Sequence, residues 1–284
     1  MAPSSAQIKS LVTQFHDLSG APERVASRYL KATNYRLDAA LDSYYAGNND
    51  AKPSPLETRL NSLFDSLRDT KNDEKDKMEV DSTMSYLGQK LRVSLENAEL
   101  FVVLELVQAP SVGEITRAGF VEGWKATRTE ATVEAQAAYV QNLISSLSSD
   151  PAYFKKVYKH VFVAGREGDQ KALGLDVAQV YWGILFSEPG WKWTSQNYDW
   201  LDLWKKFLAE KWTRSVNRDM WNMTLEFALK SKEDESLSFW NEDGAWPSVI
   251  DDFVEWCKNN GIGGGPGPGP GVVKSGMMDL DDIN

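Results

Sequence analysis

The chain has 284 residues, a formal net charge of −10, and a composition of 42% hydrophobic and 25% charged residues. This length can bury a sizeable core, and the acidic balance favours basic partners over nucleic acid. The N-terminus has no basic segment followed by an apolar one, and the most apolar window, AELFVVLELV, is short and contains glutamate. We therefore expect neither a secretory signal nor a membrane span.

A compact three-helix bundle is predicted for residues 5–46. Apolar side chains recur at helical spacing in the segments QIKSLVTQF, PERVASRYL and NYRLDAALDSYY, and short polar turns separate them. This spacing is typical of amphipathic helices that pack on one another. The next stretch contains two prolines and has no periodicity, so residues 47–55 are interpreted as a linker.

A larger helical domain is predicted for residues 56–260. Nearly every segment has helical spacing, so the fold class is all-α with two very short strands. The chain has 11 tryptophans, and all but one lie within 182–256, which predicts a tightly packed aromatic core there. Residues 261–284 are rich in glycine and proline and end in an acidic segment, so we expect a disordered tail.

Two loops of this domain resemble EF-hand loops joined by a small two-stranded ribbon. With Val80 and Ile115 as the apolar eighth residues, the twelfth positions hold Met84 and Gly119. A calcium loop needs oxygen ligands at alternate positions and a bidentate glutamate at the twelfth. The sequence therefore predicts two degenerate EF-hand-like units that bind no metal.

The sequence shows no catalytic constellation. His16 and His160 are far apart, and no HxxxH, CxxC or HExxH motif is present. The single cysteine, Cys257, cannot form an intramolecular disulfide, fits a reducing compartment, and lies on an apolar stripe, so it is interpreted as a buried structural thiol. These features favour a binding protein without a cofactor over an enzyme.

One stretch, NEDGAWPSVIDDFVEW (241–256), contains five acidic residues and no lysine or arginine. Its proline, Pro247, predicts the start of a helix that continues to about residue 259. Apolar residues from Val249 to Cys257 form the inward face, and Asp251 and Glu255 lie on the opposite side. The residues alone fit either a solvated acidic face or a surface that docks a basic partner.

Several long motifs resemble those of the defective-in-cullin-neddylation proteins. They occur in the order known for the family: FVEGW (120–124), GLDVAQVYWGILF (174–186), LDLWKKFL (201–208), NRDMWNMTLEF (217–227) and GAWPSVIDDFVEW (244–256). The resemblance implies a UBA-like three-helix module followed by a potentiating-neddylation domain. It further implies a co-E3 scaffold, located in nucleus and cytoplasm, that has no catalytic residues of its own.

Such a scaffold binds two partners, the C-terminal winged-helix region of a cullin and the neddylation E2 with its acetylated N-terminus. It promotes transfer of the ubiquitin-like modifier to a cullin lysine. By resemblance, the cullin-binding patch is Asp219, Ala245 and Asp251. The pocket for the E2 peptide maps by register onto apolar residues that would otherwise be interpreted as ordinary core: Leu100, Val103, Leu104, Val107, Ile115, Ala164 and Ile184.

The UBA-like module raises ubiquitin, or the ubiquitin-like modifier, as a further partner. The candidate residues are Leu18, Tyr44 and Tyr45, which would alternatively pack the small core of the bundle. The sequence "DLSGAP" replaces the loop usual in such modules. Two alternatives to the co-E3 scaffold thus remain: a ubiquitin-binding adaptor, and an EF-hand-like interaction protein without a ligase role.

Overall fold

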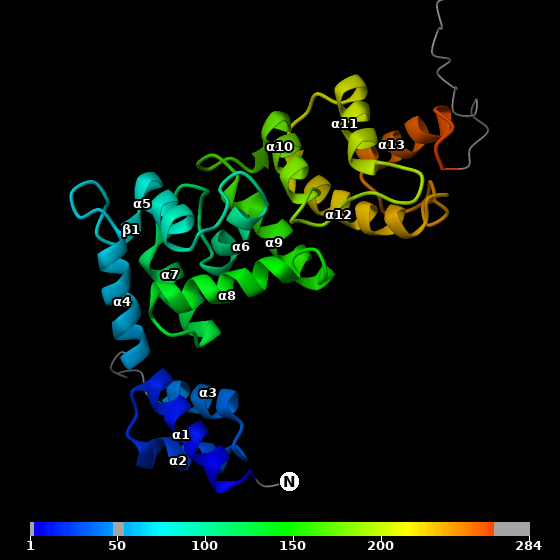
Figure 1. The fold of residues 1–284 in the computed structure, drawn as a ribbon. Coiled ribbons are helices and arrows are strands. Elements are labelled where there is room, and N and C mark those ends of the chain that lie inside the picture. The colour runs from blue at the N-terminus through cyan, green and yellow to red at the C-terminus, as the bar shows by residue number, and fades with distance from the viewer. Residues whose placement is uncertain (1–2, 48–53, 264–284) are drawn as a thin grey trace, which may run out of the picture. The chain divides into compact units, whose positions relative to one another are not determined.

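In the computed structural model, which describes residues 3–47 and 54–263, helices dominate as predicted (Figure 1). The all-α fold class is therefore confirmed, but the described residues form four strands of two residues each, where the sequence predicted two. The predicted linker, apart from its ends, and the predicted disordered tail beyond residue 263 lie outside the described residues. None of the described helices is both long and apolar enough to cross a membrane.

The described chain divides into two compact units. One contains the residues up to Leu173 together with Gly183–Lys192, and the other contains Gly174–Trp182 together with the residues from Trp193 onward. The boundary between these units thus falls inside the larger domain predicted from the sequence.

The first unit begins with a three-helix bundle of α1 (Ser5–Ser19), α2 (Glu23–Ala32) and α3 (Leu37–Gly47). Ser4 and Gln7 form a reciprocal capping box at the start of α1, and Gly20 ends the helix in the left-handed region at φ 68°. The ring of Phe15 packs edge-on against Tyr44 with centroids 5.7 Å apart, and both side chains are buried. The small core is therefore aromatic.

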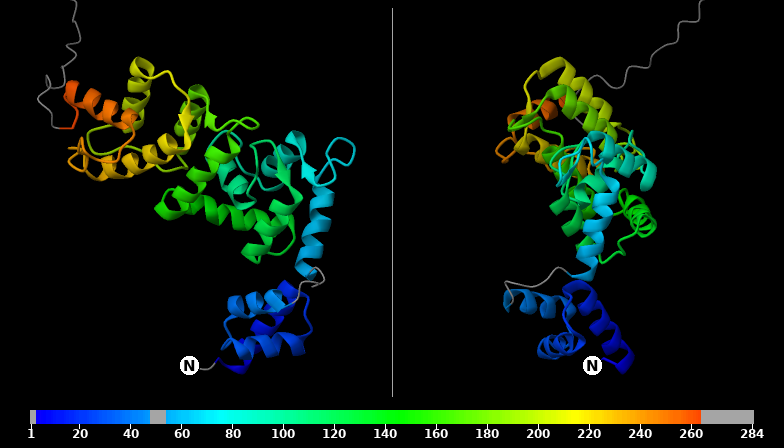
Figure 2. Two further views of the ribbon diagram at one scale, coloured as in Figure 1. Left: turned by 180° about the vertical axis from the view of Figure 1, so that it is seen from behind. Right: turned by 90° about the vertical axis from the view of Figure 1, so that its left-hand side faces the viewer.

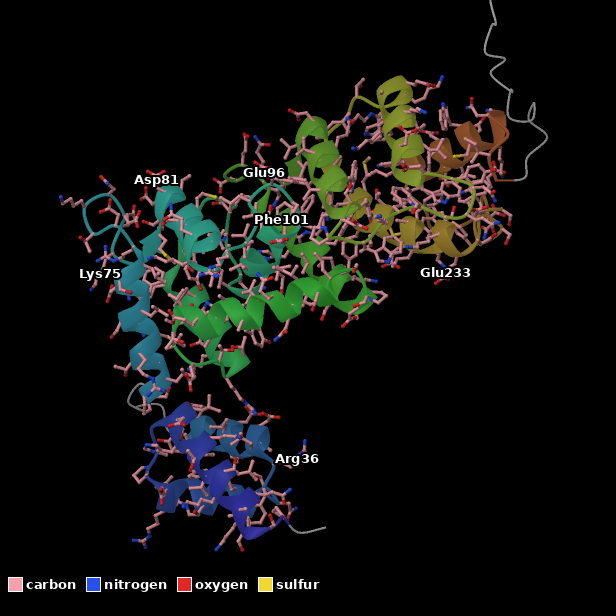
Figure 3. All side chains as sticks on the ribbon, viewed as in Figure 1. Arg36, Lys75, Asp81, Glu96, Phe101 and Glu233 are labelled. Atoms are coloured by element: carbon pink, nitrogen blue, oxygen red, sulfur yellow. The ribbon has the colours of Figure 1, made fainter. Side chains whose placement is uncertain are left out.

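The rest of the first unit is built mainly from two helix pairs, α4 with α7 and α6 with α9. Figure 2 shows these helices from two further sides, and Figure 3 shows Phe101 among the packed side chains while Asp81 and Glu96 point outward. The elements of this unit are α4 (Pro55–Leu67), β1 (Lys77–Met78), α5 (Val80–Met84), the π-helix η1 (Ser85–Lys90), α6 (Glu99–Leu106), β2 (Ile115–Thr116), α7 (Arg117–Thr127), α8 (Val133–Ser146), α9 (Pro151–Ala164) and β3 (Ala172–Leu173).

The second unit is a tryptophan-rich helical core. Its elements are the first part of α10 (Leu175–Leu185), with α11 (Trp200–Lys211), β4 (Val216–Asn217), α12 (Arg218–Glu233) and α13 (Ser248–Asn259). The rings of Trp182 and Trp221 stack with centroids 5.3 Å apart, and Trp204 meets Phe253 edge-on at 5.0 Å. All four side chains are fully buried, which confirms the aromatic core predicted from the clustering of tryptophan.

Candidate protein-binding surfaces

Helix α13 forms where the sequence predicts it. Pro247 is the N-cap with an extended backbone, so its ring stands just before the first helical turn. The whole predicted inward stripe is buried: Val249, Ile250, Phe253, Val254 and Cys257. This stripe anchors α13 and fixes which of its residues face outward.

Asp251 is less exposed than its place opposite the stripe suggests. It is half-buried, and the indole Nε1–H of Trp240 donates a hydrogen bond to its Oδ1 over 2.9 Å. The ammonium of Lys258 lies 4.1 Å from the centroid of the same indole ring. Asp251 is therefore only partly solvated, because the loop before α13 folds Trp240 against the carboxylate.

The other two residues of the predicted cullin-binding patch are exposed. Asp219 lies in the first turn of α12, whose N-cap is Asn217, and Ala245 lies in the loop that leads into α13. This loop is closely packed, since a Cβ on Gly244 would lie only 2.9 Å from the carbonyl oxygen of Asn241. Two small residues thus follow one another where a partner can approach the backbone.

All three patch residues lie in the second unit, and α12 packs against α13. Both carboxylates belong to the first turn of a helix, where the backbone dipole stabilises negative charge. No described interaction links the three side chains directly. The patch therefore consists of two helix-start carboxylates and one loop alanine, and it is not a hydrogen-bonded cluster.

The remaining acids of the 241–256 stretch are exposed: Glu242, Asp243, Asp252 and Glu255. Asp252 and Glu255 also border a groove of about 550 Å³ between α11 and α13. Across this groove, the indole of Trp256 donates to a carboxylate oxygen of Glu210 over 2.8 Å. The outer side of α13 is therefore acidic from Asp251 to Glu255, and Lys258 follows in the last turn.

The predicted E2 pocket residues lie in the first unit, on α6, β2, α9 and the end of α10. All of them except Ile184 are buried, from Leu100 at 7% exposure to Val103 at 0%. One exposed apolar residue nearby was missed by the sequence reasoning: Val180 is 59% exposed and precedes Ile184 by one helical turn on α10. Helical periodicity identifies the apolar residues of a helix but does not tell which of them remain exposed in the fold, so the sequence could not single out Val180.

The three candidate ubiquitin-binding residues serve the bundle itself. Leu18 and Tyr44 are buried, and the ring of Tyr44 packs against Tyr29 and Tyr45 as well as Phe15. Tyr45 is 38% exposed, but its hydroxyl donates to the carbonyl oxygen of Leu18 over 2.7 Å. The structure therefore favours the core-packing interpretation for Leu18 and Tyr44.

The ribbon between the EF-hand-like units has a different register from the predicted one. Met78, not Val80, pairs with Ile115 across β1 and β2. Met78 is fully buried, whereas Val80 is 59% exposed and begins α5. A shift of two residues keeps the same alternation of faces, so the sequence pattern could not distinguish the two registers.

An arginine closes the first EF-hand-like loop. The guanidinium of Arg117 donates to Asp76 over 2.7 Å and to Asp65 over 2.5 Å, and it lies 4.6 Å from the ring centroid of Phe64. Asp73 accepts hydrogen bonds from the backbone of Asp69 and Glu79. Among the described residues, no group of three histidine, cysteine or acidic side chains could hold a metal ion.

Comparisons with known proteins show the family of the chain. A family model described as "Cullin binding" matches residues 135–256, and a model described as "UBA-like domain" matches residues 9–50. "Defective in cullin neddylation protein 1" of Pyricularia oryzae is 44% identical over 92% of this chain and 96% of its own length. The protein of the same name from Yarrowia lipolytica is 33% identical over 84% and 92%. "DCN1-like protein 5" of Rattus norvegicus is 30% identical over 62% and 69%.

Proposed function

This chain belongs to the defective in cullin neddylation family and has a role in cullin neddylation, and we propose that it acts there as a scaffold without catalytic side chains. In this proposal it binds a cullin and the neddylation E2 at the same time. The ε-amine of a cullin lysine attacks the thioester carbonyl, an amide bond forms, and the E2 cysteine leaves as a thiol. Holding both partners together makes their encounter effectively intramolecular.

The cullin site proposed here is the patch of Asp219, Ala245 and Asp251. The observation that carries it is that two helix-start carboxylates and a small, exposed alanine all lie in the second unit, within the region matched by the cullin-binding model. Carboxylates in such positions suit a basic partner surface, and Ala245 leaves room for it. The exposed acids around them would contribute mainly to the association rate.

The E2 site proposed here is an apolar surface that receives the acetylated N-terminal methionine. Its accessible part would be Ile184 on α10, because the other candidate residues are buried. The buried members, such as Leu100 and Val103 on α6, would form the wall behind the peptide. Burying one methionine side chain against such a surface contributes about 1.5–3 kcal/mol.

Charge reversal tests the cullin site directly. We expect Asp219→Lys and Asp251→Lys each to weaken binding of a purified cullin C-terminal domain at least tenfold. Glu233→Lys is the matched control, because Glu233 is an exposed acid at the far end of α12 (Figure 3). Binding unchanged by both patch variants would exclude this site.

A reconstituted transfer assay tests the scaffold role. With limiting cullin and charged E2, the intact chain should raise the rate of cullin modification, and Asp251→Lys should remove most of that gain. Without any E2, no product should form. Product formed without E2 would show that the chain has catalytic groups of its own.

The ubiquitin-adaptor alternative is separable from the scaffold. We expect a chain lacking residues 1–50 to retain most of its stimulation of cullin modification in vitro. Tyr45→Ala should likewise leave cullin binding unchanged, since Tyr45 belongs to the bundle and its side chain already bonds to Leu18. If both variants lost the ability to stimulate cullin modification, the result would favour the ubiquitin-binding adaptor over the scaffold.

A further inference from the structure

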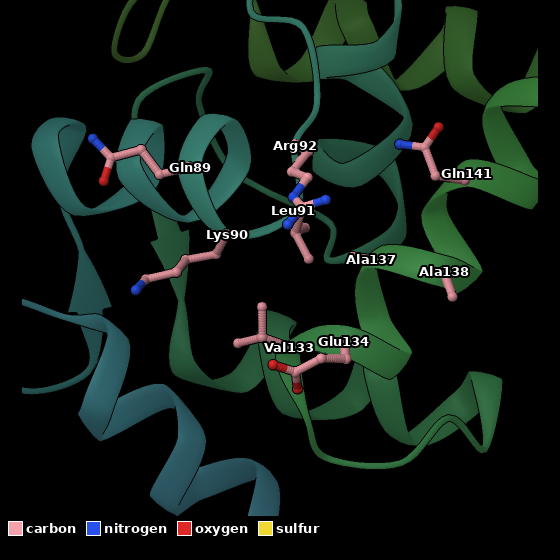
Figure 4. Close-up of a pocket in the computed structure, with 9 residues that line it drawn as sticks. All are labelled: Gln89, Lys90, Leu91, Arg92, Val133, Glu134, Ala137, Ala138 and Gln141. Carbon is pink, nitrogen blue, oxygen red and sulfur yellow. The ribbon is translucent and has the colours of Figure 1, made fainter.

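The first unit contains an open groove that the proposed cullin and E2 sites do not use. It has a volume of about 690 Å³, within the range of ligand sites, and lies between the end of η1 and helix α8. Figure 4 shows the two groups of side chains facing each other across it. The lining residues are Gln89, Lys90, Leu91, Arg92, Val133, Glu134, Ala137, Ala138 and Gln141.

The two walls of this groove are fixed relative to each other. The hydroxyl of Tyr86 on η1 donates to Oε1 of Gln136 on α8 over 2.8 Å, and both side chains are buried. A buried hydrogen bond of this kind is costly to break, because it would leave two polar groups without partners. The groove is therefore preformed, and a ligand would not have to order its walls.

One wall carries two cations that are available to a ligand. Lys90 and Arg92 are both exposed, and neither forms an ion pair with an acidic side chain in the part of the chain that the structure describes. Their positive charges are set against a chain whose formal net charge is −10. The surface charge at this pair is therefore positive, whereas the net charge of the chain is negative.

The backbone at Arg92 is unusual. Its φ is 57°, in the left-handed region that only six described non-glycine residues adopt, and it directly follows Leu91, the C-cap of the π-helix η1. The amide of Leu91 donates to the carbonyl of Tyr86, and that of Val93 donates to Leu87, which is the arrangement that normally selects glycine. A bulky arginine in this strained position, directly after a π-helix, is a combination typical of functional sites.

The floor and the opposite wall decide what kind of ligand fits. Val133 and Ala137 are half-buried and offer apolar contacts to a ligand, whereas Leu91 is fully buried and supports the floor from beneath. Glu134 stands on the wall opposite the cations and would repel a compact, multiply charged phosphate group or a nucleic-acid backbone. A peptide with separated apolar and acidic side chains satisfies both walls.

We propose that this groove binds an acidic amphipathic peptide segment of a protein partner. Its apolar side chains lie on Val133 and Ala137, and its carboxylates pair with Lys90 and Arg92. Glu134 sets the orientation of the segment, because carboxylates are favoured on one side of the groove only. The site is separate from the proposed cullin and E2 surfaces, and its partner is acidic, whereas the proposed cullin patch suits a basic partner.

A labelled peptide tests this on the full chain. The probe is a fluorescein-labelled peptide of repeating Leu-Glu-Glu triplets, compared by anisotropy with its Leu-Gln-Gln and Gly-Glu-Glu counterparts. We expect only the first to bind measurably, with an affinity that falls as salt is added. Amide resonances of residues 89–92 and 133–141 should shift on titration.

Variants locate the site. Lys90→Glu with Arg92→Glu should reduce the affinity at least tenfold, and Arg59→Glu, at an exposed cation on α4, should not. Ala138→Trp fills the groove from an exposed position, so it should block binding while circular dichroism stays unchanged. Any of three results would overturn the proposal. The Gly-Glu-Glu peptide would bind as tightly as the Leu-Glu-Glu peptide, or the amide resonance shifts would be confined to residues outside the groove. The third such result is a peptide affinity that stays unchanged in both groove variants. The amide resonances of residues 89–92 are also measured without peptide at several concentrations of the chain. Shifts that depend on this concentration would mean that a second copy of the chain occupies the groove, and they would also overturn the proposal.

Discussion

The indole of Trp240 donates a hydrogen bond to the carboxylate of Asp251 over 2.9 Å, and this contact joins the loop before α13 to the first turn of that helix. Lys258, two turns further along α13, lies over the face of the same ring at 4.1 Å. The proposed cullin contact is thus positioned by an aromatic residue outside the patch. Trp240 fixes the carboxylate before any partner arrives.

We predict that Trp240→Phe weakens binding of the cullin C-terminal domain. The substitution keeps a ring under Lys258 but removes the N–H, so the Asp251 carboxylate must be ordered on binding. Losing one such hydrogen bond corresponds to about 0.5–1.5 kcal/mol, or roughly two- to tenfold in dissociation constant. Isothermal titration measures the effect, with Trp212→Phe as the control, since that indole donates only to a backbone carbonyl. Tighter binding would mean that Trp240 competes with the partner.

Arg117 should stabilise the first EF-hand-like loop in place of a metal ion. We expect Arg117→Ala to lower the free energy of unfolding by about 1–3 kcal/mol, because it removes two carboxylate pairs and the contact with Phe64. Arg117→Lys should recover only part of the loss, since lysine lacks the planar fork. Urea denaturation with and without Ca²⁺ measures both effects. A calcium-dependent increase in the stability of either the parent or the variant would contradict the account of the loop.

Burial of His160 should make the protein less stable at mildly acidic pH. Its imidazole lies in the α6–α9 interface near Glu105 and Lys156, and desolvation lowers its pKa below the ordinary value. The unfolded chain therefore binds the proton more readily, so stability falls as pH drops below about 6.5, by no more than about 1.4 kcal/mol per pH unit for one proton. Unfolding free energies at several pH values between 7.5 and 5.5 should show a shallower pH dependence for His160→Gln. An identical slope in both proteins would rule out this contribution.

Cys257 should be unreactive in the folded protein. The thiol is fully buried on the inner face of α13, and burial raises its pKa, which suppresses the nucleophilic thiolate. We expect no labelling by a thiol reagent at pH 8 in buffer and complete labelling in denaturant. Cys257→Ala should lower the free energy of unfolding by about 1–2 kcal/mol through the loss of packing. Rapid labelling of the native protein would contradict the buried position.

Local pattern was sufficient for much of the fold. Pro247 and the apolar spacing after it predict both the start of α13 and its buried stripe, because capping and periodicity act within one helix. The same reasoning predicts the all-α fold and the tryptophan core. Family motifs added the candidate patch of Asp219, Ala245 and Asp251, which remains a prediction.

Tertiary structure decided what periodicity leaves open. Apolar residues at helical spacing suit a core and a pocket equally, so only three-dimensional packing could separate buried Val103 from partly exposed Ile184. The register of the β1–β2 ribbon depends on the partner strand, which placed Met78 and not Val80 opposite Ile115. The contact between Trp240 and Asp251, and the groove braced by Tyr86 and Gln136, both join residues that are not neighbours in the chain. Contacts between residues that are distant in sequence depend on the tertiary fold, because loop closure brings them together. The local sequence around each residue does not determine them.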